Sequence, residues 1–269
     1  MKVQFLLVPY DSGRREWRMG RGPSYLLRHG VGSGVRALGH EVDAEYVDAA
    51  PTETTEIATS FSLYRQVAER AREARRRGAL PIVLGGNCGV TLGAVAGVGD
   101  VGVLWLDAHA DFNTPETTRS GFLDGMALAA LTGRCWRTMT ASIPGFVAMP
   151  ETNVVLAGAR DLDPAEEELL AESEVTVVRG RTAIAPALEA LRERVSRLHF
   201  HLDADVLDGA ANAFAAPNGL TSQELVEIAR LAAGRFEIVS ITVSAYDPEI
   251  DAEGAIPPAI AAALEVIIR

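Results

Sequence analysis

The sequence of 269 residues contains only two cysteines, Cys88 and Cys135. Two cysteines are too few for a framework of disulfides, which indicates a reduced, cytoplasmic setting. Residues 1–13 lack the apolar length and the cleavage site of a signal peptide. No apolar run approaches the roughly 18–20 residues that a transmembrane helix needs. We therefore expect a cytoplasmic protein that does not cross a membrane.

Positive charge is also scarce. The sequence has 25 Lys and Arg residues but 36 Asp and Glu residues, which gives a net charge of −11. A chain this acidic is a poor candidate for binding nucleic acid or an anionic membrane. Its charge is compatible with a cationic small molecule or with divalent metal ions.

Strands and helices are predicted to alternate along the whole sequence. Apolar runs predict eight strands, at Val3–Val8, Glu41–Val47, Pro81–Leu84, Val101–Asp107, Asn153–Ala157, Val175–Val178, His199–Asp203 and Phe236–Val243. Helical periodicity and caps predict helices at Pro23–Gly30, Phe61–Gly78, from Val90, at Asp124–Thr132, after Pro164, at Ala185–Leu198, from Thr221 and at Pro257–Ile268. Residues 11–21 read as a polar loop.

Several of the predicted strands are apolar on both faces, as in a mostly parallel sheet covered by helices on both sides. Hydrophobic residues make up 48% of the chain, which is enough for a sizeable core. No Ser- or Pro-rich linker divides the sequence. We therefore predict an α/β fold in a single domain over residues 1–269.

Two clusters of potential metal ligands follow predicted strands. Asp107, His109 and Asp111 occupy alternate positions, so an extended segment turns all three to the same side. Asp203 and Asp205 repeat this layout after a second strand. Two carboxylates and an imidazole suit Mn, Zn or Fe, and the excess of oxygen ligands favours Mn.

A third candidate segment is Gly85–Gly89, which joins a predicted strand to a predicted helix and contains Cys88. This is the usual place for a site in a parallel α/β sheet. His201, two residues before Asp203, is interpreted as a core or supporting histidine rather than a ligand. Asp208 is interpreted as the cap of a turn.

Several carboxylates in one buried pocket would repel each other strongly without a cation. One or two divalent ions remove that cost, and water bound between two ions becomes hydroxide near neutral pH. The expected chemistry is hydrolysis of a poor electrophile such as an amidine, a guanidine or an amide. Hydrolysis of a phosphoester is an alternative, although no Gly-rich phosphate loop of the P-loop kind is present.

These motifs resemble the arginase superfamily, the ureohydrolases. The resemblance is carried, in the order of the family, by Gly85–Cys88 (GGNC), Asp107–Asp111 (DAHAD), Asn113–Gly121 (NTPETTRSG) and Asp203–Asp208 (DADVLD). It implies a three-layer α/β/α domain with an eight-stranded parallel sheet, and a Mn-dependent hydrolase of guanidino compounds. It also implies a homo-oligomer, either a trimer or a hexamer.

The resemblance assigns roles to individual residues. In a site of two Mn ions, Asp107 and Asp203 would bridge, His109 and Asp205 would complete one ion, and Asp111 with Cys88 would complete the other. Asp111 would also act in catalysis, by orienting the attacking hydroxide and taking its proton. The residues that would bind an amino-acid head group are Asn113, Thr118, Ser120, Asp163 and Glu166. Asp163 and Glu166 are equally well explained as the acidic first turn of a helix.

Four departures from the family pattern qualify this prediction. Cys88 replaces a metal-binding His, and Asn87 replaces the Asp beside it. A thiolate is a soft ligand that suits Mn poorly, so the number of ions is one or two. Asp124 replaces the catalytic proton-shuttling His, and an ordinary Asp is a poor acid at pH 7 unless burial raises its pKa. Ala245 replaces the Glu that pairs with the guanidinium, and Phe122 replaces a polar loop residue.

The Cys at position 88 and the loop after Asp111 resemble the branch that hydrolyses N-hydroxyarginine. The predicted function is therefore hydrolysis of arginine or N-hydroxyarginine, giving urea or hydroxyurea and an ornithine-like product. The alternative is a catalytically impaired member of the fold with a ligand-binding or scaffold role. An amidohydrolase similar to the histone deacetylases is disfavoured by the paired Asp-rich motifs.

Overall fold

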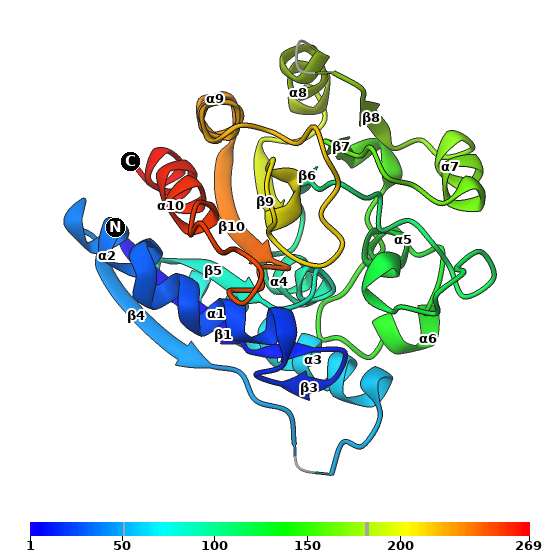
Figure 1. Cartoon of the computed structure of the whole chain (residues 1–269), viewed down its shortest axis with the longest axis horizontal. Helices are drawn as coiled ribbons and strands as arrows, with labels where there is room; N and C mark the ends of the chain where they lie inside the picture. The colour runs from blue at the N-terminus through cyan, green and yellow to red at the C-terminus, as the bar shows by residue number, and fades with distance from the viewer. Residues whose placement is uncertain (51, 181–182) are drawn as a thin grey trace.

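The computed structural model describes residues 1–50, 52–180 and 183–269. Its centre is an eight-stranded parallel sheet in the order β4-β1-β5-β10-β9-β6-β7-β8 (Figure 1). The strands are β1 (Lys2–Val8), β4 (Glu41–Tyr46), β5 (Ala79–Gly85), β6 (Gly102–Leu106), β7 (Val154–Ala157), β8 (Thr176–Val178), β9 (Arg197–Asp203) and β10 (Glu237–Ser244). All eight predicted strands are confirmed, and so is the parallel sheet.

Helices cover both faces of this sheet. The main helices are α1 (Gly22–Leu26), α2 (Gly32–Ala37), α3 (Glu56–Arg76), α4 (Val90–Val98), α5 (Ala127–Leu131), α6 (Arg137–Thr140), α7 (Pro164–Ala171), α8 (Ile184–Arg192), α9 (Ser222–Ala233) and α10 (Ile256–Ile267). Shorter helical turns are η1 (Arg18–Arg21), η2 (Leu27–Val31), η3 (Asp124–Met126), η4 (Glu151–Asn153) and η6 (Ala204–Val206). No helix in the described part of the chain is long and apolar enough to cross a membrane.

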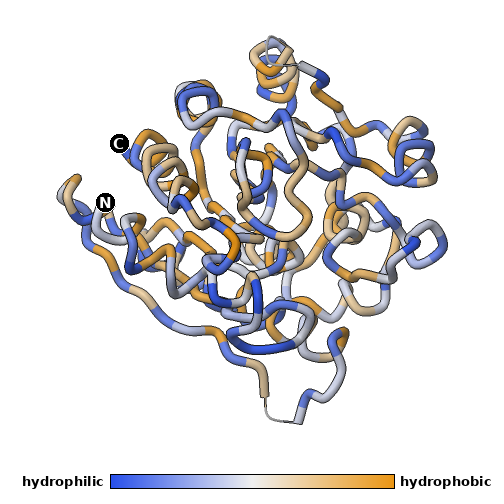
Figure 2. The backbone as a smooth tube through the Cα atoms, viewed as in Figure 1, coloured by the Kyte–Doolittle hydropathy of each residue, from blue (hydrophilic) through white to orange (hydrophobic). Residues whose placement is uncertain are grey.

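The sheet separates two hydrophobic cores. In β1, Val3, Phe5 and Leu7 pack on the side of α1, α2, α8, α9 and α10, whereas Leu6 and Val8 pack on the side of α3, α4 and α5. This alternation follows from the two-residue period of a strand. Figure 2 shows hydrophobic residues along the central strands, while hydrophobic and hydrophilic residues alternate along the outer helices. The three-layer α/β/α architecture is therefore confirmed.

Three predicted elements differ from the structure. The helix expected at 185–198 ends at Arg192, and β9 already begins at Arg197. Val195 and Leu198 fit both the helical period and the two-residue period of a strand, so their pattern did not separate the two elements. The helix expected at 61–78 begins five residues earlier, where the Thr55 hydroxyl accepts a hydrogen bond from the Ala58 amide. The loop expected at 11–21 contains a short antiparallel hairpin of β2 (Tyr10–Asp11) and β3 (Arg14–Arg15), followed by η1.

Candidate metal centre

The carboxyl ends of four neighbouring strands, β5, β10, β9 and β6, meet at one edge of the sheet. Asp107 follows β6 directly, Asp203 ends β9, Ala245 follows β10, and Cys88 comes three residues after β5. A cavity of about 270 Å³ opens at this edge. Its lining includes Cys88, His109, Asp111, Asn113, Ser120, Phe122, Asp124, Asp163, Glu166, Asp203, Asp205, Asn212, Phe214 and Ala245. A parallel sheet places its sites at this edge because all of its strands end there.

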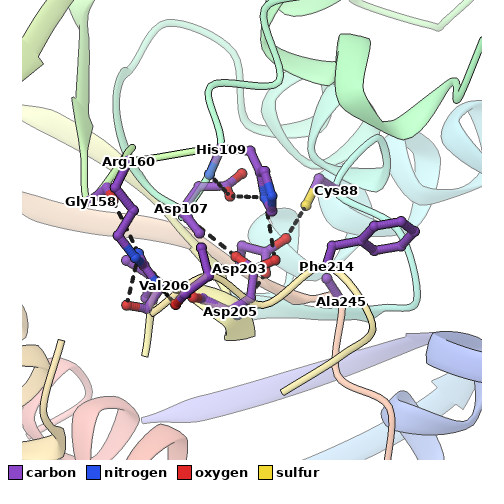
Figure 3. Close-up of polar contacts among 12 residues, drawn as sticks. Cys88, Asp107, His109, Gly158, Arg160, Asp203, Asp205, Val206, Phe214 and Ala245 are labelled. Atoms are coloured by element: carbon purple, nitrogen blue, oxygen red, sulfur yellow. Dashed lines mark hydrogen bonds and ion pairs between the residues drawn. The ribbon is translucent and has the colours of Figure 1, made fainter. Parts of the chain in front are cut away.

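Asp107, His109 and Asp205 form one group of potential ligands. One ligand atom from each lies within 4.8 Å of the other two. The His109 Nδ1 atom is 3.4 Å from Asp107 Oδ1 and 3.4 Å from Asp205 Oδ2 (Figure 3). Burial would lower the pKa of His109, but its hydrogen bonds to the two carboxylates raise it to about 11. The positive charge of the His109 imidazolium thus neutralises the carboxylates of Asp107 and Asp205, as a divalent cation bound between them would do.

Backbone and indole groups fix these carboxylates in place. Asp107 accepts hydrogen bonds from the His109 amide, at 2.7 Å, and from the Trp105 indole, at 3.0 Å. Asp205 Oδ1 accepts from the Ala108 amide at 3.2 Å. The Asp205 amide in turn donates to Asp203 Oδ1 at 2.8 Å. Preformed contacts of this kind orient metal ligands before an ion binds.

Asp111 adds a carboxylate with spare bonding capacity. Its Oδ2 atom is buried and has no hydrogen-bond partner among the described residues. Burial, and then the nearby Asp107, raise the pKa of Asp111 well above its usual value. Its φ of 49° lies in the left-handed region, a strained conformation that is typical of functional sites. Buried carboxylates with an unpaired oxygen and one imidazole are a donor set that fits Mn²⁺.

Cys88 is buried beside the second carboxylate motif. Its thiol donates to Asp203 Oδ2 at 2.9 Å (Figure 3). Its Sγ also lies 3.1 Å from the Ser244 hydroxyl. Burial, and then the Asp203 carboxylate, raise the pKa of this thiol well above its usual value. Cys88 also belongs to a second group of potential ligands, with Asp107 and His201.

His201 is fully buried on β9. Its ring stacks on the Trp105 indole with 3.6 Å between centroids, and its Nδ1 atom lies 2.8 Å from the Thr91 hydroxyl. Burial lowers the pKa of His201 well below its usual value. Asp208 accepts a hydrogen bond from the Gly219 amide, as expected for the cap of a turn.

Asp124 lies in η3 at the wall of the cavity. Its carboxylate accepts hydrogen bonds from the Gly89 amide, at 3.0 Å, and from the Asn87 side-chain amide, at 2.9 Å. Burial raises the pKa of Asp124 to about 7, although these hydrogen bonds act in the opposite direction. Asp124 can therefore exchange a proton near neutral pH, which an exposed aspartate cannot do.

The predicted substrate residues are distributed unevenly. Asn113, Ser120, Asp163 and Glu166 line the cavity. Thr118 is not among the lining residues, and its hydroxyl accepts a hydrogen bond from the Gly121 amide and lies 3.5 Å from the Ser120 hydroxyl.

Two backbone amides donate hydrogen bonds to the Glu166 carboxylate. Its Oε1 atom accepts from the Phe112 amide at 2.8 Å, and its Oε2 atom accepts from the Asp163 amide in a capping box at the start of α7. These contacts match the interpretation of Asp163 and Glu166 as the acidic first turn of a helix.

The loop after β9 supplies contacts that the sequence motifs did not reveal. Asn212 donates to Asp205 Oδ2 at 3.1 Å and to the Ala245 carbonyl at 2.7 Å. The Phe214 ring stacks on Phe122 across the cavity, with 5.4 Å between centroids. Ala245 has a φ of 59°, another left-handed residue in the cavity wall.

Arg160 was also missed as a supporting residue. Its guanidinium donates to five backbone carbonyls, those of Gly158, Asp205, Val206, Ala216 and Pro217 (Figure 3). It thereby ties the end of β7 to the turn that carries Asp205. An arginine three residues after β7 was the only signal available for this role.

Comparisons with known proteins agree with the fold and the motifs. The arginase family matches residues 1–268. The arginase of Agrobacterium fabrum is 31% identical over 287 residues, which cover 93% of this chain and 86% of that protein. The arginase of Eremothecium gossypii is 29% identical, covering 93% and 70%. The solved structure of Bacillus caldovelox arginase superposes with a TM-score of 0.89 at 25% identity, covering 99% of this chain and 97% of that one. The chain therefore belongs to the arginase family and is a hydrolase of the manganese-dependent ureohydrolase kind.

Proposed function

We propose that this chain hydrolyses a C–N bond of a guanidino- or amidino-amino acid of the arginine or N-hydroxyarginine type. The products would be urea or hydroxyurea and an ornithine-like amino acid. The observation that supports this most directly is the buried group Asp107, His109 and Asp205 beside a cavity of about 270 Å³. A divalent ion in such a group supplies a hydrolytic nucleophile near neutral pH.

In this proposal the protein holds one or two Mn ions through Asp107, His109, Asp203 and Asp205, with Asp111 and Cys88 completing a second position. Asp111 also orients the nucleophile and takes its proton. Its unpaired Oδ2 atom and its raised pKa support that role, because the carboxyl can carry a proton where an exposed Asp would not.

Asp124 passes a proton to the leaving amine in place of the histidine of the family. A general acid works best when its pKa is close to the operating pH, and the pKa of about 7 meets that condition. Asn87 and the Gly89 amide hold the carboxylate at the cavity wall.

The head group of the substrate would lie towards Asn113, Ser120, Asp163 and Glu166. These side chains offer hydrogen bonds and negative charge to an α-ammonium group. Thr118 would act through Ser120, whose hydroxyl it approaches. The side-chain carboxylate of Asp163 is also 4.0 Å from Arg119, which would set its position at the cavity mouth.

The reactive end of the substrate would lie near Ala245, which offers no carboxylate to a guanidinium. A hydroxyguanidine is less basic than a guanidine and depends less on such a partner. The thiol at Cys88 is compatible with the same preference, since it weakens one Mn position. These features favour N-hydroxyarginine over arginine.

The test is to supply the Mn-loaded chain with each amino acid and to measure hydroxyurea, urea and the amino-acid product. We expect hydroxyurea from N-hydroxyarginine at a higher kcat/KM than urea from arginine. The substitution Ala245→Glu should shift this ratio towards arginine, and the neutral control Ala245→Gln should not. The preference for N-hydroxyarginine fails if no hydroxyurea appears. Release of neither product by a fully Mn-loaded chain would favour the catalytically impaired alternative.

The organisation of the protein stays a prediction. A single domain over residues 1–269, a trimer or hexamer, and a cytoplasmic location are all consistent with the family, and light scattering on the purified chain would test the assembly.

A further inference from the structure

The group formed by Cys88, Asp107 and His201 differs in chemistry from the oxygen-rich group around His109. One ligand atom from each of the three residues lies within 4.8 Å of the other two, and all three side chains are buried. The set combines one sulfur, one nitrogen and one carboxylate oxygen. A thiolate and an imidazole favour zinc over manganese.

One ring nitrogen of His201 is bonded within the protein, and the other is unpaired among the described residues. Its Nδ1 atom is held at 2.8 Å by the Thr91 hydroxyl, and its Nε2 atom is buried with no hydrogen-bond partner among the described residues. A proton on Nδ1 leaves the lone pair on Nε2 free to coordinate. An unpaired buried polar atom costs about 1–3 kcal/mol, and a bound ion would remove that cost.

The surroundings supply the remaining features of such a site. Asp203 Oδ2 is 2.9 Å from Cys88 Sγ and can provide a fourth ligand. The stacked Trp105 ring fixes the plane of the imidazole and its indole also donates to Asp107. Ligand atoms around tetrahedral zinc are separated by roughly 3.5 Å, given bond lengths of about 2.0–2.3 Å. The three atoms therefore need to close in only modestly around an ion.

We propose that Cys88, His201 and Asp107, with Asp203, form a thiolate-containing site selective for zinc or cobalt over manganese. The Cys88 thiol loses its proton to the solvent as its sulfur binds the cation, so one proton is released for each ion bound. This inference goes beyond the proposed function, because it concerns binding by His201 and does not require that any substrate be hydrolysed.

Cobalt reports directly on the sulfur, because a cobalt–thiolate bond gives a charge-transfer band in the near ultraviolet. The metal-stripped chain would be titrated with Co²⁺ alone, alongside the variants Cys88→Ser, His201→Asn and His199→Asn. His199 is a matched control: it lies two residues earlier on β9, is fully buried, bonds a hydroxyl through Nδ1, and likewise has an unpaired Nε2 within the described part of the chain. In both variants the Asn side chain can keep the hydrogen bond that Nδ1 makes to the hydroxyl, but it has no atom in the place of Nε2.

We expect the band in the wild-type chain and in His199→Asn, no band in Cys88→Ser, and at least tenfold more Co²⁺ for half-saturation in His201→Asn. Absence of the band from the wild-type chain would overturn the proposal, and so would equal titrations of His201→Asn and His199→Asn.

A second measurement covers the case in which His201→Asn does not fold. X-ray absorption of the His109→Asn chain loaded with one Zn²⁺ should show sulfur and imidazole around the same ion. Sulfur without imidazole, or no sulfur, would overturn the assignment of His201.

Discussion

The substitution Arg160→Lys tests how the metal-binding turn is held. The guanidinium donates to the carbonyls of Asp205 and Ala216 at 2.8 Å, of Pro217 at 3.0 Å, of Gly158 at 3.1 Å and of Val206 at 3.4 Å. A lysine ammonium has three donors on a single nitrogen and cannot reproduce the planar fork. At least two of the five carbonyls must therefore lose their partner.

Each lost hydrogen bond costs about 1–1.5 kcal/mol when water can partly replace it, so Arg160→Lys should destabilise the chain by about 2–3 kcal/mol. For a protein of this size that corresponds to a fall in Tm of roughly 4–12 °C. The turn that carries Asp205 also loosens, and the loss of such a supporting contact weakens metal binding by about 10- to 100-fold.

The assay is thermal unfolding with and without Mn²⁺, together with Mn²⁺ titration by calorimetry. Arg197→Lys is the matched control, since Arg197 also donates to two carbonyls, those of Asp100 and Val98, but at the opposite end of β9. We expect Arg197→Lys to leave the Mn²⁺ affinity unchanged. Wild-type Mn²⁺ affinity in Arg160→Lys would refute the role assigned to Arg160.

Three further outcomes follow from the site. The first concerns the chain from which metal has been removed with a chelator. Because the pKa of Asp124 is raised to about 7 in the folded state, the folded chain keeps a proton that the unfolded chain has already lost. The free energy of unfolding should therefore fall as pH rises from about 4 to about 7. Urea titrations should show this slope reduced in Asp124→Asn, and an unchanged slope would contradict it. Asp205→Ala should abolish Mn²⁺ binding and hydrolysis, whereas Asp208→Ala, which removes only a turn cap, should keep both. Cys88→His should raise the Mn content per chain in elemental analysis, and an unchanged content would exclude Cys88 from the second metal position.

The sheet was predictable because its strands are short apolar runs whose length and flanking turns decide their type. The ends of helices were less predictable. Val195 fits the helical period of α8 but lies in the turn before β9, and no local signal separates the two states. The hairpin at Tyr10–Arg15 consists of two-residue strands, which are too short to show a period.

The metal-binding motifs were visible because their residues are close in sequence. Asp107, His109 and Asp111 need only an extended backbone to share a side. The contacts of Asn212 and Arg160 depend on a loop that folds back over the end of β9, and sequence spacing contains no information on that path. The raised pKa of Asp124 is similarly a property of its burial and not of its type.

The departures from the family pattern are mutually compatible, which argues against a site in decay. A carboxylate at position 87 would repel Asp124, but Asn87 donates a hydrogen bond to it. The Cys88 thiol likewise donates to Asp203 instead of leaving that carboxylate unpaired. Random loss of function would leave buried groups without partners, since nothing selects for their replacement. The substituted Asn87 and Asp124 are bonded to each other, and Cys88 is bonded to Asp203. The ligand group beside them is intact, so the substitutions are better explained by a change of substrate or metal than by loss of activity.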